Sequence, residues 1–328
     1  MSYPIHNIES ITVDIVLATF NGEKYLEQQL NSLIMQTHQN WKLLISDDGS
    51  SDLTLTILHY FSSLDSRIAI VNTIRQGGVV ANFTKALSFV TSDYVLFCDQ
   101  DDVWSDNKIN LMLKNIFEEE SKLGKLTPIL GFSDATLVNH DLSIICPSFY
   151  GAHNLNPLNN LDGRFLIWRS SVYGCTVIFN KALYEMAMPM PYSVPMHDQW
   201  FALVASFTGR VFYMPIQLTL YRQHVSNVIG ARPKGAFKWL LAIFENFRNI
   251  KKDISFSIKQ IRSLNSIRFR EDNTLKNVLY FSRGLSSDSR MVMKLRFVLG
   301  CVMPFWREKK IYTTLFSVLF ILKRVDEE

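Results

Sequence analysis

The stretch ITVDIVLATFNG (11–22) decides the fold of this 328-residue chain. Its β-branched run at 11–17 is typical of a buried strand in a parallel sheet, and polar residues follow at 19–22. Between residues 25 and 34, apolar residues then recur at the spacing of one helix face. A strand, a polar loop and a helix in this order form the repeating unit of an α/β protein.

The same unit is repeated up to residue 98. We expect strands at 41–46, 68–72 and 94–98 and helices at 53–61 and 82–90. Right-handed crossovers would bring the loops that follow the strands to one edge of the sheet. Ligands bind at this carboxyl edge in open α/β sheets, so a functional site is expected in these loops. The sequence therefore predicts an α/β fold with a mainly parallel sheet.

The rest of the chain is divided by a polar boundary at 232–235. After the boundary, the apolar residues between Phe237 and Phe247 lie on one face of a helical pattern. We therefore expect one domain at 1–230 and a helical extension at 231–328. Within residues 105–220 we expect helices at 108–123 and 198–207 and strands at 129–132, 171–179 and 211–214.

The composition indicates a globular protein of a reducing compartment. Hydrophobic residues make up 48% of the chain, enough to bury a large core. The four cysteines contain no CxxC pair, so we expect reduced thiols and no zinc site or disulfide framework. The first ten residues contain no basic region followed by an apolar stretch. No secretory signal is therefore expected, and the cytoplasm is the predicted location.

The charge is divided unevenly along the chain. Residues 231–328 carry 20 Lys and Arg against 9 Asp and Glu, whereas residues 1–230 carry 14 against 21. The apolar run at 311–322 has 12 residues, and about 20 are needed to span a bilayer. Its basic flanks instead indicate peripheral helices that lie on the anionic inner face of a cell membrane. The alternatives are a helical cap on the first domain and a homodimer contact.

The strongest functional signal is YVLFCDQDDVW (94–104), in which an apolar strand ends in the carboxylates of Asp99, Asp101 and Asp102. Like charges this close together are unfavourable unless a positive charge neutralises them. Mg²⁺ or Mn²⁺ would do so, since these cations prefer carboxylate oxygens and bridge to phosphates. Such an ion would stabilise charge on a departing diphosphate. The alternative is a solvated acidic loop whose aspartates cap a helix.

Two further aspartates are weaker signals when each is taken alone. Asp48, in DDGS (47–50), is suited to accept hydrogen bonds from a nucleobase or ribose. The alternative is that this motif only forms a turn. Asp198, in HDQW (197–200), is suited to act as a general base toward an acceptor hydroxyl. The alternative is that it only caps a helix.

The motif YRQH (221–224) is a third weak signal. Arg222 would pair with a diphosphate, and His224 would contact the metal or the leaving group. The alternative is that both are surface charges on a loop.

Taken together and in order, these motifs resemble bacterial family 2 glycosyltransferases, and within them the rhamnosyltransferase-like branch. The resemblance covers about residues 11–230. It rests on VDIVLATFNGEKYLEQQLNSLIMQT (13–37), ISDDGSSDLT (45–54), GGVVANF (77–83), FCDQDDVW (97–104), YGCTVIFNKAL (173–183), HDQWFALVA (197–205) and YRQHVSN (221–227).

The resemblance implies a GT-A fold, a nucleotide-diphosphate-sugar donor, a divalent metal and inversion at the anomeric carbon. It makes Asp198 the catalytic base and places Asp99, Asp101 and Asp102 at the metal. The donor would contact Phe20, Asn21, Asp48, Asp99 and Arg222. The substrate side of the pocket would contain Gly174, Cys175, His197, Trp200 and His224.

The branch similarity suggests dTDP-L-rhamnose as the donor and an O-antigen or other polysaccharide intermediate, free or lipid-linked, as the acceptor. The base motif begins with His197 where many family members have Glu, and this form is common in the rhamnosyltransferase-like branch. The QxxRW motif of processive members is absent, which favours addition of a single sugar. A UDP-hexose or UDP-N-acetylhexosamine is the alternative donor.

Two other classes fit the residues less well. A nucleotidyltransferase would carry a glycine-rich basic phosphate loop near its N-terminus, and residues 19–22 lack one. A nucleic-acid-binding protein would use the basic extension, but there the basic residues alternate with long apolar runs, which suits lipid better than a phosphate backbone. We therefore expect no nucleic-acid partner.

Overall fold

The computed structural model describes residues 8–223 and the short stretches 254–255, 257–260, 263–264, 294–295 and 298–305. His224, the boundary at 232–235 and the helical pattern at 237–247 lie outside the described residues. The division into two domains therefore stays a prediction.

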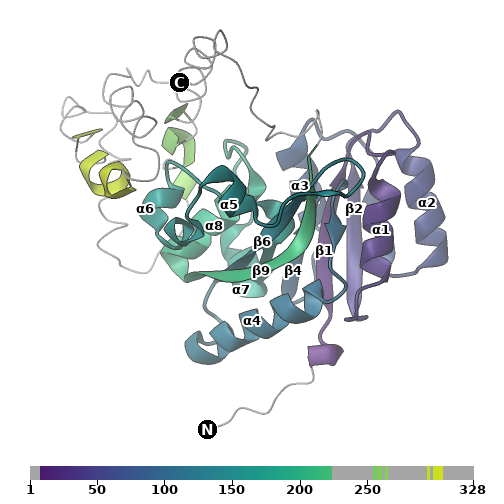
Figure 1. Cartoon of the computed structure of the whole chain (residues 1–328), viewed down its shortest axis with the longest axis horizontal. Coiled ribbons are helices and arrows are strands. Elements are labelled where there is room, and N and C mark those ends of the chain that lie inside the picture. Colours follow the sequence, from purple (N-terminus) through teal and green to yellow (C-terminus); the bar gives the residue numbers. More distant parts are fainter. Residues whose placement is uncertain are drawn as a thin grey trace.

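The N-terminal half is a series of parallel strands joined by helices, as expected (Figure 1). Its strands lie in the order β3-β2-β1-β4. They are β1 (Val13–Thr19), β2 (Trp41–Asp47), β3 (Ile68–Asn72) and β4 (Tyr94–Cys98), and the helices are α1 (Leu26–Ile34), α2 (Thr54–Leu64) and α3 (Val79–Leu87). The predicted α/β fold is confirmed.

The second half continues the same sheet beyond β4 in the order β8-β6-β9-β5. These strands are β8 (Val177–Asn180), β6 (Ile129–Val138), β9 (Arg210–Arg222) and β5 (Val103–Trp104), and β7 (Ile144–Cys146) pairs with β6. Strand β8 is antiparallel to β4, and β5 is antiparallel to β9. The acidic residues 99–102 therefore form the link from β4 in the middle of the sheet to β5 at its edge.

Helices cover both faces of the sheet. Helices α1, α2 and α4 (Lys108–Leu123) pack on one face, where alternate β1 residues such as Ile15 and Leu17 point. Helices α3, α7 (Lys181–Ala187) and α8 (His197–Thr208) pack on the other face, toward which Val16 points. The shorter helical turns are η1 (Ile8–Ser10), α5 (Phe149–His153), η2 (Pro157–Leu161), α6 (Gly163–Leu166), η3 (Gly174–Thr176), η4 (Val298–Val302) and η5 (Met303–Phe305).

Three expected strands have different lengths in the structure. The strand expected at 129–132 continues to Val138 as β6. The strand expected at 171–179 is limited to β8, because residues 174–176 form the turn η3. The strand expected at 211–214 extends to Arg222 as β9. Pro215 cannot donate to a neighbouring strand, but the pairing with β6 shifts at this point and then resumes. Continuation past this irregularity is what carries β9 to the acidic loop.

The described stretches of the C-terminal extension pack against the first domain. Ile254, Ile258 and Val302 belong to the hydrophobic core that contains α6 and α8. The indole nitrogen of Trp168 also donates a hydrogen bond of 2.9 Å to the carbonyl oxygen of Cys301. For these stretches, the structure agrees with the alternative of a helical cap. Among the described helices, none combines the length and the apolar character needed to cross a bilayer.

The contact between β6 and β9 leads to a stability prediction. Gly131 pairs with Phe212, and a Cβ atom at position 131 would overlap the Phe212 ring. We expect Gly131→Ala to lower the free energy of unfolding by about 1–3 kcal/mol because the core is overpacked. Urea denaturation measures this change. The additional substitution Phe212→Leu should recover part of the loss, and a double variant less stable than Gly131→Ala would contradict the steric explanation.

Candidate active site

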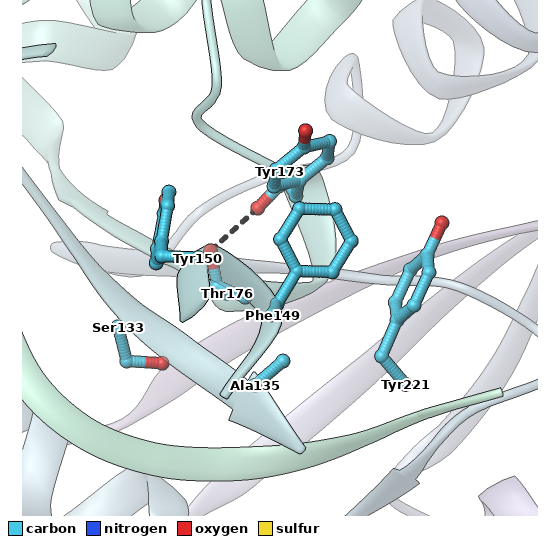
Figure 2. Close-up of a pocket in the computed structure, with 7 residues that line it drawn as sticks. All are labelled: Ser133, Ala135, Phe149, Tyr150, Tyr173, Thr176 and Tyr221. Carbon is cyan, nitrogen blue, oxygen red and sulfur yellow. Dashed lines mark hydrogen bonds between the residues drawn. The ribbon is translucent and has the colours of Figure 1, made fainter. Parts of the chain in front are cut away.

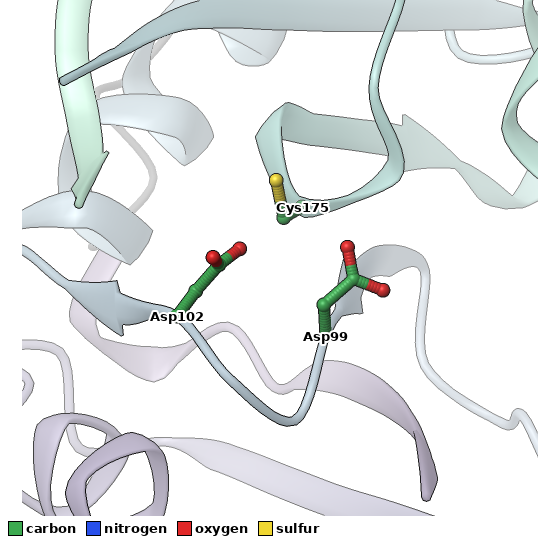
Figure 3. Close-up of side chains that lie close together, drawn as sticks. All are labelled: Asp99, Asp102 and Cys175. Carbon is green, nitrogen blue, oxygen red and sulfur yellow. The ribbon is translucent and has the colours of Figure 1, made fainter. Parts of the chain in front are cut away.

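The acidic loop, residues 99–102, lies at the carboxyl end of β4. Figure 3 shows that the side chains of Asp99, Asp102 and Cys175 lie close together, and one carboxylate oxygen of each aspartate and the Cys175 sulfur lie within 4.8 Å of each other. Asp102 is buried, and its Oδ1 accepts a hydrogen bond of 3.2 Å from the backbone nitrogen of Arg222. Its Oδ2 is buried without a hydrogen-bond partner in the described part of the chain.

The electrostatics of this loop favour a cation. Burial, followed by the charges of Asp101 and Asp198, raises the pKa of Asp99 to about 7. Burial and the charges of Asp101 and Asp99 raise the pKa of Asp102 well above its usual value. Carboxylate oxygens suit Mg²⁺ or Mn²⁺, and the unpartnered Oδ2 of Asp102 is an available ligand atom. The residues therefore fit a divalent cation, and a metal requirement stays a prediction.

Lys108 is a buried cation beside the loop that the sequence analysis missed. Its Nζ donates to the carbonyl oxygen of Cys175 at 2.5 Å and to Thr219 Oγ1 at 2.8 Å, and it lies 3.7 Å from the centre of the Trp104 ring. Burial lowers the pKa of Lys108 to about 8, although the neighbouring Asp102 and Asp99 favour the charged form. In the sequence, Lys108 is indistinguishable from an exposed lysine in the first turn of a helix.

The loop after β1 is joined to the acidic loop by Gln100. The Gln100 side chain accepts a hydrogen bond of 2.9 Å from the Phe20 nitrogen and donates one of 3.1 Å to the Phe20 oxygen. Asn21 has a positive φ of 47°, and its Oδ1 accepts a hydrogen bond of 2.9 Å from the Ser51 nitrogen. The Phe20 side chain is 47% exposed, which leaves it available to a ligand. Donor contacts by Phe20 and Asn21 stay predictions.

Asp48 holds a third loop in place. Its carboxylate accepts hydrogen bonds from the backbone nitrogens of Gln76, Gly77 and Gly78. Both glycines have positive φ values, 90° and 130°, which L side chains rarely adopt. In this structure Asp48 therefore shapes the loop before α3, and its contact with a nucleobase or ribose stays a prediction.

Asp198 lies in the first turn of α8, at the same edge of the sheet. Its Oδ2 accepts a hydrogen bond of 2.8 Å from the Gly174 nitrogen, and its Oδ1 accepts one of 2.7 Å from the Gln199 nitrogen. Burial raises the pKa of Asp198 to about 6, although these hydrogen bonds act in the opposite direction. A carboxylate with a pKa near the working pH is suited to accept a proton.

His197 is a neutral, buried neighbour of this carboxylate. Its ring stacks on Phe83 with 3.7 Å between ring centres, and burial lowers its pKa to about 3. Neither ring nitrogen has a hydrogen-bond partner among the described residues. A Cβ atom at Gly174 would lie 2.9 Å from His197 Nε2, so this close approach depends on glycine. A neutral imidazole leaves Asp198 as the stronger proton acceptor of the pair.

Two other expected site residues, Trp200 and Arg222, donate hydrogen bonds to backbone carbonyl oxygens of the protein. Trp200 is buried in the core, and its Nε1 donates a hydrogen bond of 2.9 Å to the Ala187 oxygen, so its side chain supports α8. Its contact with the substrate stays a prediction. Arg222 is also buried, and its guanidinium donates to the carbonyl oxygen of Asp101 at 2.8 Å. Its pairing with a diphosphate stays a prediction, as does the role of His224.

An aromatic wall, which the sequence analysis did not identify, borders the site on the side of β6 and β9. Figure 2 shows the crevice that it encloses, lined by Ser133, Ala135, Phe149, Tyr150, Tyr173, Thr176 and Tyr221. The ring of Phe149 lies 4.3 Å from that of Tyr173 and 5.5 Å from that of Tyr221, measured between centres. Tyr173 precedes Gly174 and Tyr221 precedes Arg222. The wall therefore adjoins both Asp198 and the acidic loop.

The sequence model described as Glycosyl transferase family 2 matches residues 14–172. The chain is also 31% identical, over 229 residues, to the dTDP-rhamnosyl transferase RfbG of Shigella flexneri. That alignment covers 66% of this chain and 74% of the relative.

Two solved structures are similar in fold. TarS residues 1–349 from S. aureus, in complex with UDP-GlcNAc, superpose with a TM-score of 0.56 at 16% identity, over 95% of this chain and 89% of that one. The mannosyltransferase PcManGT from Pyrobaculum calidifontis, in complex with GDP-Man and Mn²⁺, superposes with a TM-score of 0.52 at 13% identity. The superposition covers 100% of this chain and 92% of PcManGT.

The layered sheet has the GT-A fold of these two structures, and the family model and the relative in Shigella flexneri make the chain a glycosyltransferase. Within this class, the chain belongs to glycosyltransferase family 2. The family resemblance seen in the sequence motifs is confirmed.

Proposed function

We propose that this glycosyltransferase inverts the anomeric centre and moves a single sugar from a nucleotide-diphosphate sugar to a glycan or lipid-linked glycan. The observation that carries the proposal is the position of Asp198. This buried carboxylate lies close enough to the acidic loop for its charge to act on Asp99. A proton acceptor beside a diphosphate-binding loop is what a single displacement needs.

In the proposed reaction, the acceptor hydroxyl oxygen forms a bond to the anomeric carbon. The bond from that carbon to the diphosphate oxygen breaks, and its electron pair leaves with the nucleotide diphosphate. Asp198 takes the hydroxyl proton, while the Gly174 N–H holds one oxygen of its carboxylate in place. A divalent cation bound by Asp99, Asp101 and Asp102 would supply positive charge to the diphosphate.

The proposed donor is dTDP-L-rhamnose, and the proposed pathway is synthesis of O-antigen or another surface polysaccharide. The similarity to a dTDP-rhamnosyl transferase supports this donor. The alternative is a UDP-hexose or UDP-N-acetylhexosamine, of which UDP-GlcNAc is the ligand of TarS. We place the acceptor on the side of β6 and β9, because the loops proposed to contact the nucleotide follow β1 and β2 at the other end of the sheet.

We further propose that the enzyme works at the inner face of the cell membrane. The excess of basic residues in 231–328 would attract anionic headgroups. Within the described stretches, Leu295, Leu299 and Met303 are exposed at a spacing of four residues, while Val298 and Val302 are buried. Exposed apolar residues in a segment whose sequence is rich in basic residues support contact with a lipid surface.

The donor and the metal are tested together. We expect dTDP-L-rhamnose to bind more tightly than UDP-glucose, UDP-GlcNAc or GDP-mannose in the presence of Mn²⁺ or Mg²⁺, and we expect excess chelator to abolish the preference. Calorimetry and donor hydrolysis measure both effects. Tighter binding of a UDP-sugar would replace the rhamnosyl assignment, and full activity in chelator would remove the metal from the proposal.

The base role predicts a selective effect of Asp198→Asn. Transfer should fall by about 10²–10⁴-fold because the amide cannot take a proton. Donor binding should remain close to that of the wild type, since the asparagine side chain keeps the shape and one hydrogen-bond acceptor. The matched control is Asp93→Asn, an exposed aspartate before β4 at the opposite edge of the sheet. Equal losses of donor binding and transfer would show that Asp198 is not the base.

The pH dependence follows from the raised pKa of Asp198. Below about 6 this carboxyl is protonated and cannot accept the acceptor proton. At saturating Mn²⁺, kcat/KM should therefore fall about tenfold per pH unit below pH 6 and level off above it. The residual activity of Asp198→Asn should not show this fall in kcat/KM below pH 6. If the fall persists in the variant, the ionisation belongs to another group.

A further inference from the structure

The Arg222 side chain joins three separate parts of the site. Its Nε donates to the carbonyl oxygen of Asp101 at 2.8 Å, its Nη1 to that of His140 at 2.5 Å, and its Nη2 to Gln28 Oε1 at 2.6 Å. These acceptors belong to the acidic loop, the turn after β6 and helix α1. The guanidinium carbon also lies 4.4 Å from the centre of the Tyr25 ring. Arg222 is buried, with 0% of its surface exposed.

The backbone of Arg222 contacts the same loop. Its nitrogen donates to Asp102 Oδ1 at 3.2 Å, so Arg222 binds two consecutive loop residues, one through the side chain and one through the main chain. Its positive charge also lies near the charges of Asp101 and Asp102. A loop that concentrates three carboxylates repels itself, and a cation bonded to its backbone opposes that repulsion.

We propose that Arg222 is a positioning residue that holds the acidic loop in its cation-binding shape before the cation arrives. To reach a diphosphate, the guanidinium would have to give up its bonds to Asp101, His140 and Gln28, which lie on three different segments. The planar guanidinium is suited to bridge several oxygens at once, whereas the lysine ammonium concentrates its charge at one point. The proposal rests on the proposed function only in that the loop binds a divalent cation.

The proposal is tested first without any metal. Hydrogen exchange of the metal-free full-length protein is compared for wild type, Arg222→Lys and the control Arg67→Lys. Arg67 bonds Asp65 and lies over the Trp41 ring, at the amino ends of the strands. We expect Arg222→Lys to speed exchange of the amides at 100–104 by about tenfold or more. Exchange unchanged from wild type at 100–104 would overturn the proposal.

Metal and nucleotide titrations then separate the two roles of Arg222. With no nucleotide present, we expect Arg222→Lys to weaken Mn²⁺ binding by about tenfold, measured from the electron paramagnetic resonance signal of free Mn²⁺. With no metal present, dTDP binding should be unchanged. Unchanged Mn²⁺ binding together with weaker dTDP binding would make Arg222 a diphosphate ligand and overturn the proposal.

Two results would leave the Arg222→Lys experiments undecided: a variant that does not fold, and a wild-type protein that binds no Mn²⁺. If Arg222→Lys does not fold, Gln28→Leu removes a single acceptor of the guanidinium from the exposed face of α1, and the same changes in exchange and Mn²⁺ binding are expected at smaller size. Wild-type behaviour of this variant would then overturn the proposal. If the wild-type protein binds no Mn²⁺, the cation function fails, whereas the exchange experiment still decides whether Arg222 holds the loop.

Discussion

The parallel pairing of β1 with β2 and β4 is the constraint on which the site depends. Thr19 lies opposite Asp47, and Leu17 lies opposite Cys98, so the three strands end at nearly the same level. The loops that follow are therefore neighbours, although the strands end 28 and 51 positions apart in the sequence, at Thr19, Asp47 and Cys98. Their contacts then lock them: Gln100 bonds the Phe20 backbone, and Asp48 bonds the loop before α3.

Crowding of negative charge at this edge is the main cost of the arrangement. Asp99, Asp102 and Asp198 all have raised pKa values, and burial is the largest cause for each. The protein opposes this cost with two buried cations, Lys108 and Arg222, and with backbone N–H groups. These groups leave Asp102 Oδ2 unpartnered, so the described site retains the capacity to bind a further positive charge.

The sequence predicted the elements of the N-terminal half well, because the periodicity of apolar residues reports directly on strands and helices. It was less successful with β9 and with residues 171–179, where a bulge and a short turn interrupt the pattern. Lys108 and Gln100 were missed for a different reason. A buried lysine has the same local sequence as an exposed one, and only the position of its partners, Cys175 and Thr219, distinguishes the two.

The sequence by itself determined the α/β class, the strand that leads into the acidic loop, and the family to which the chain belongs. These properties depend on local periodicity and on motifs of a few residues. The tertiary structure alone decided that Asp102 meets Cys175, that Asp198 accepts from Gly174, and that Arg222 bonds the acidic loop and not open solvent. Such contacts join residues that are 24 to 121 positions apart, and the strand order that brings them together is set by burial of the whole sheet between two layers of helices.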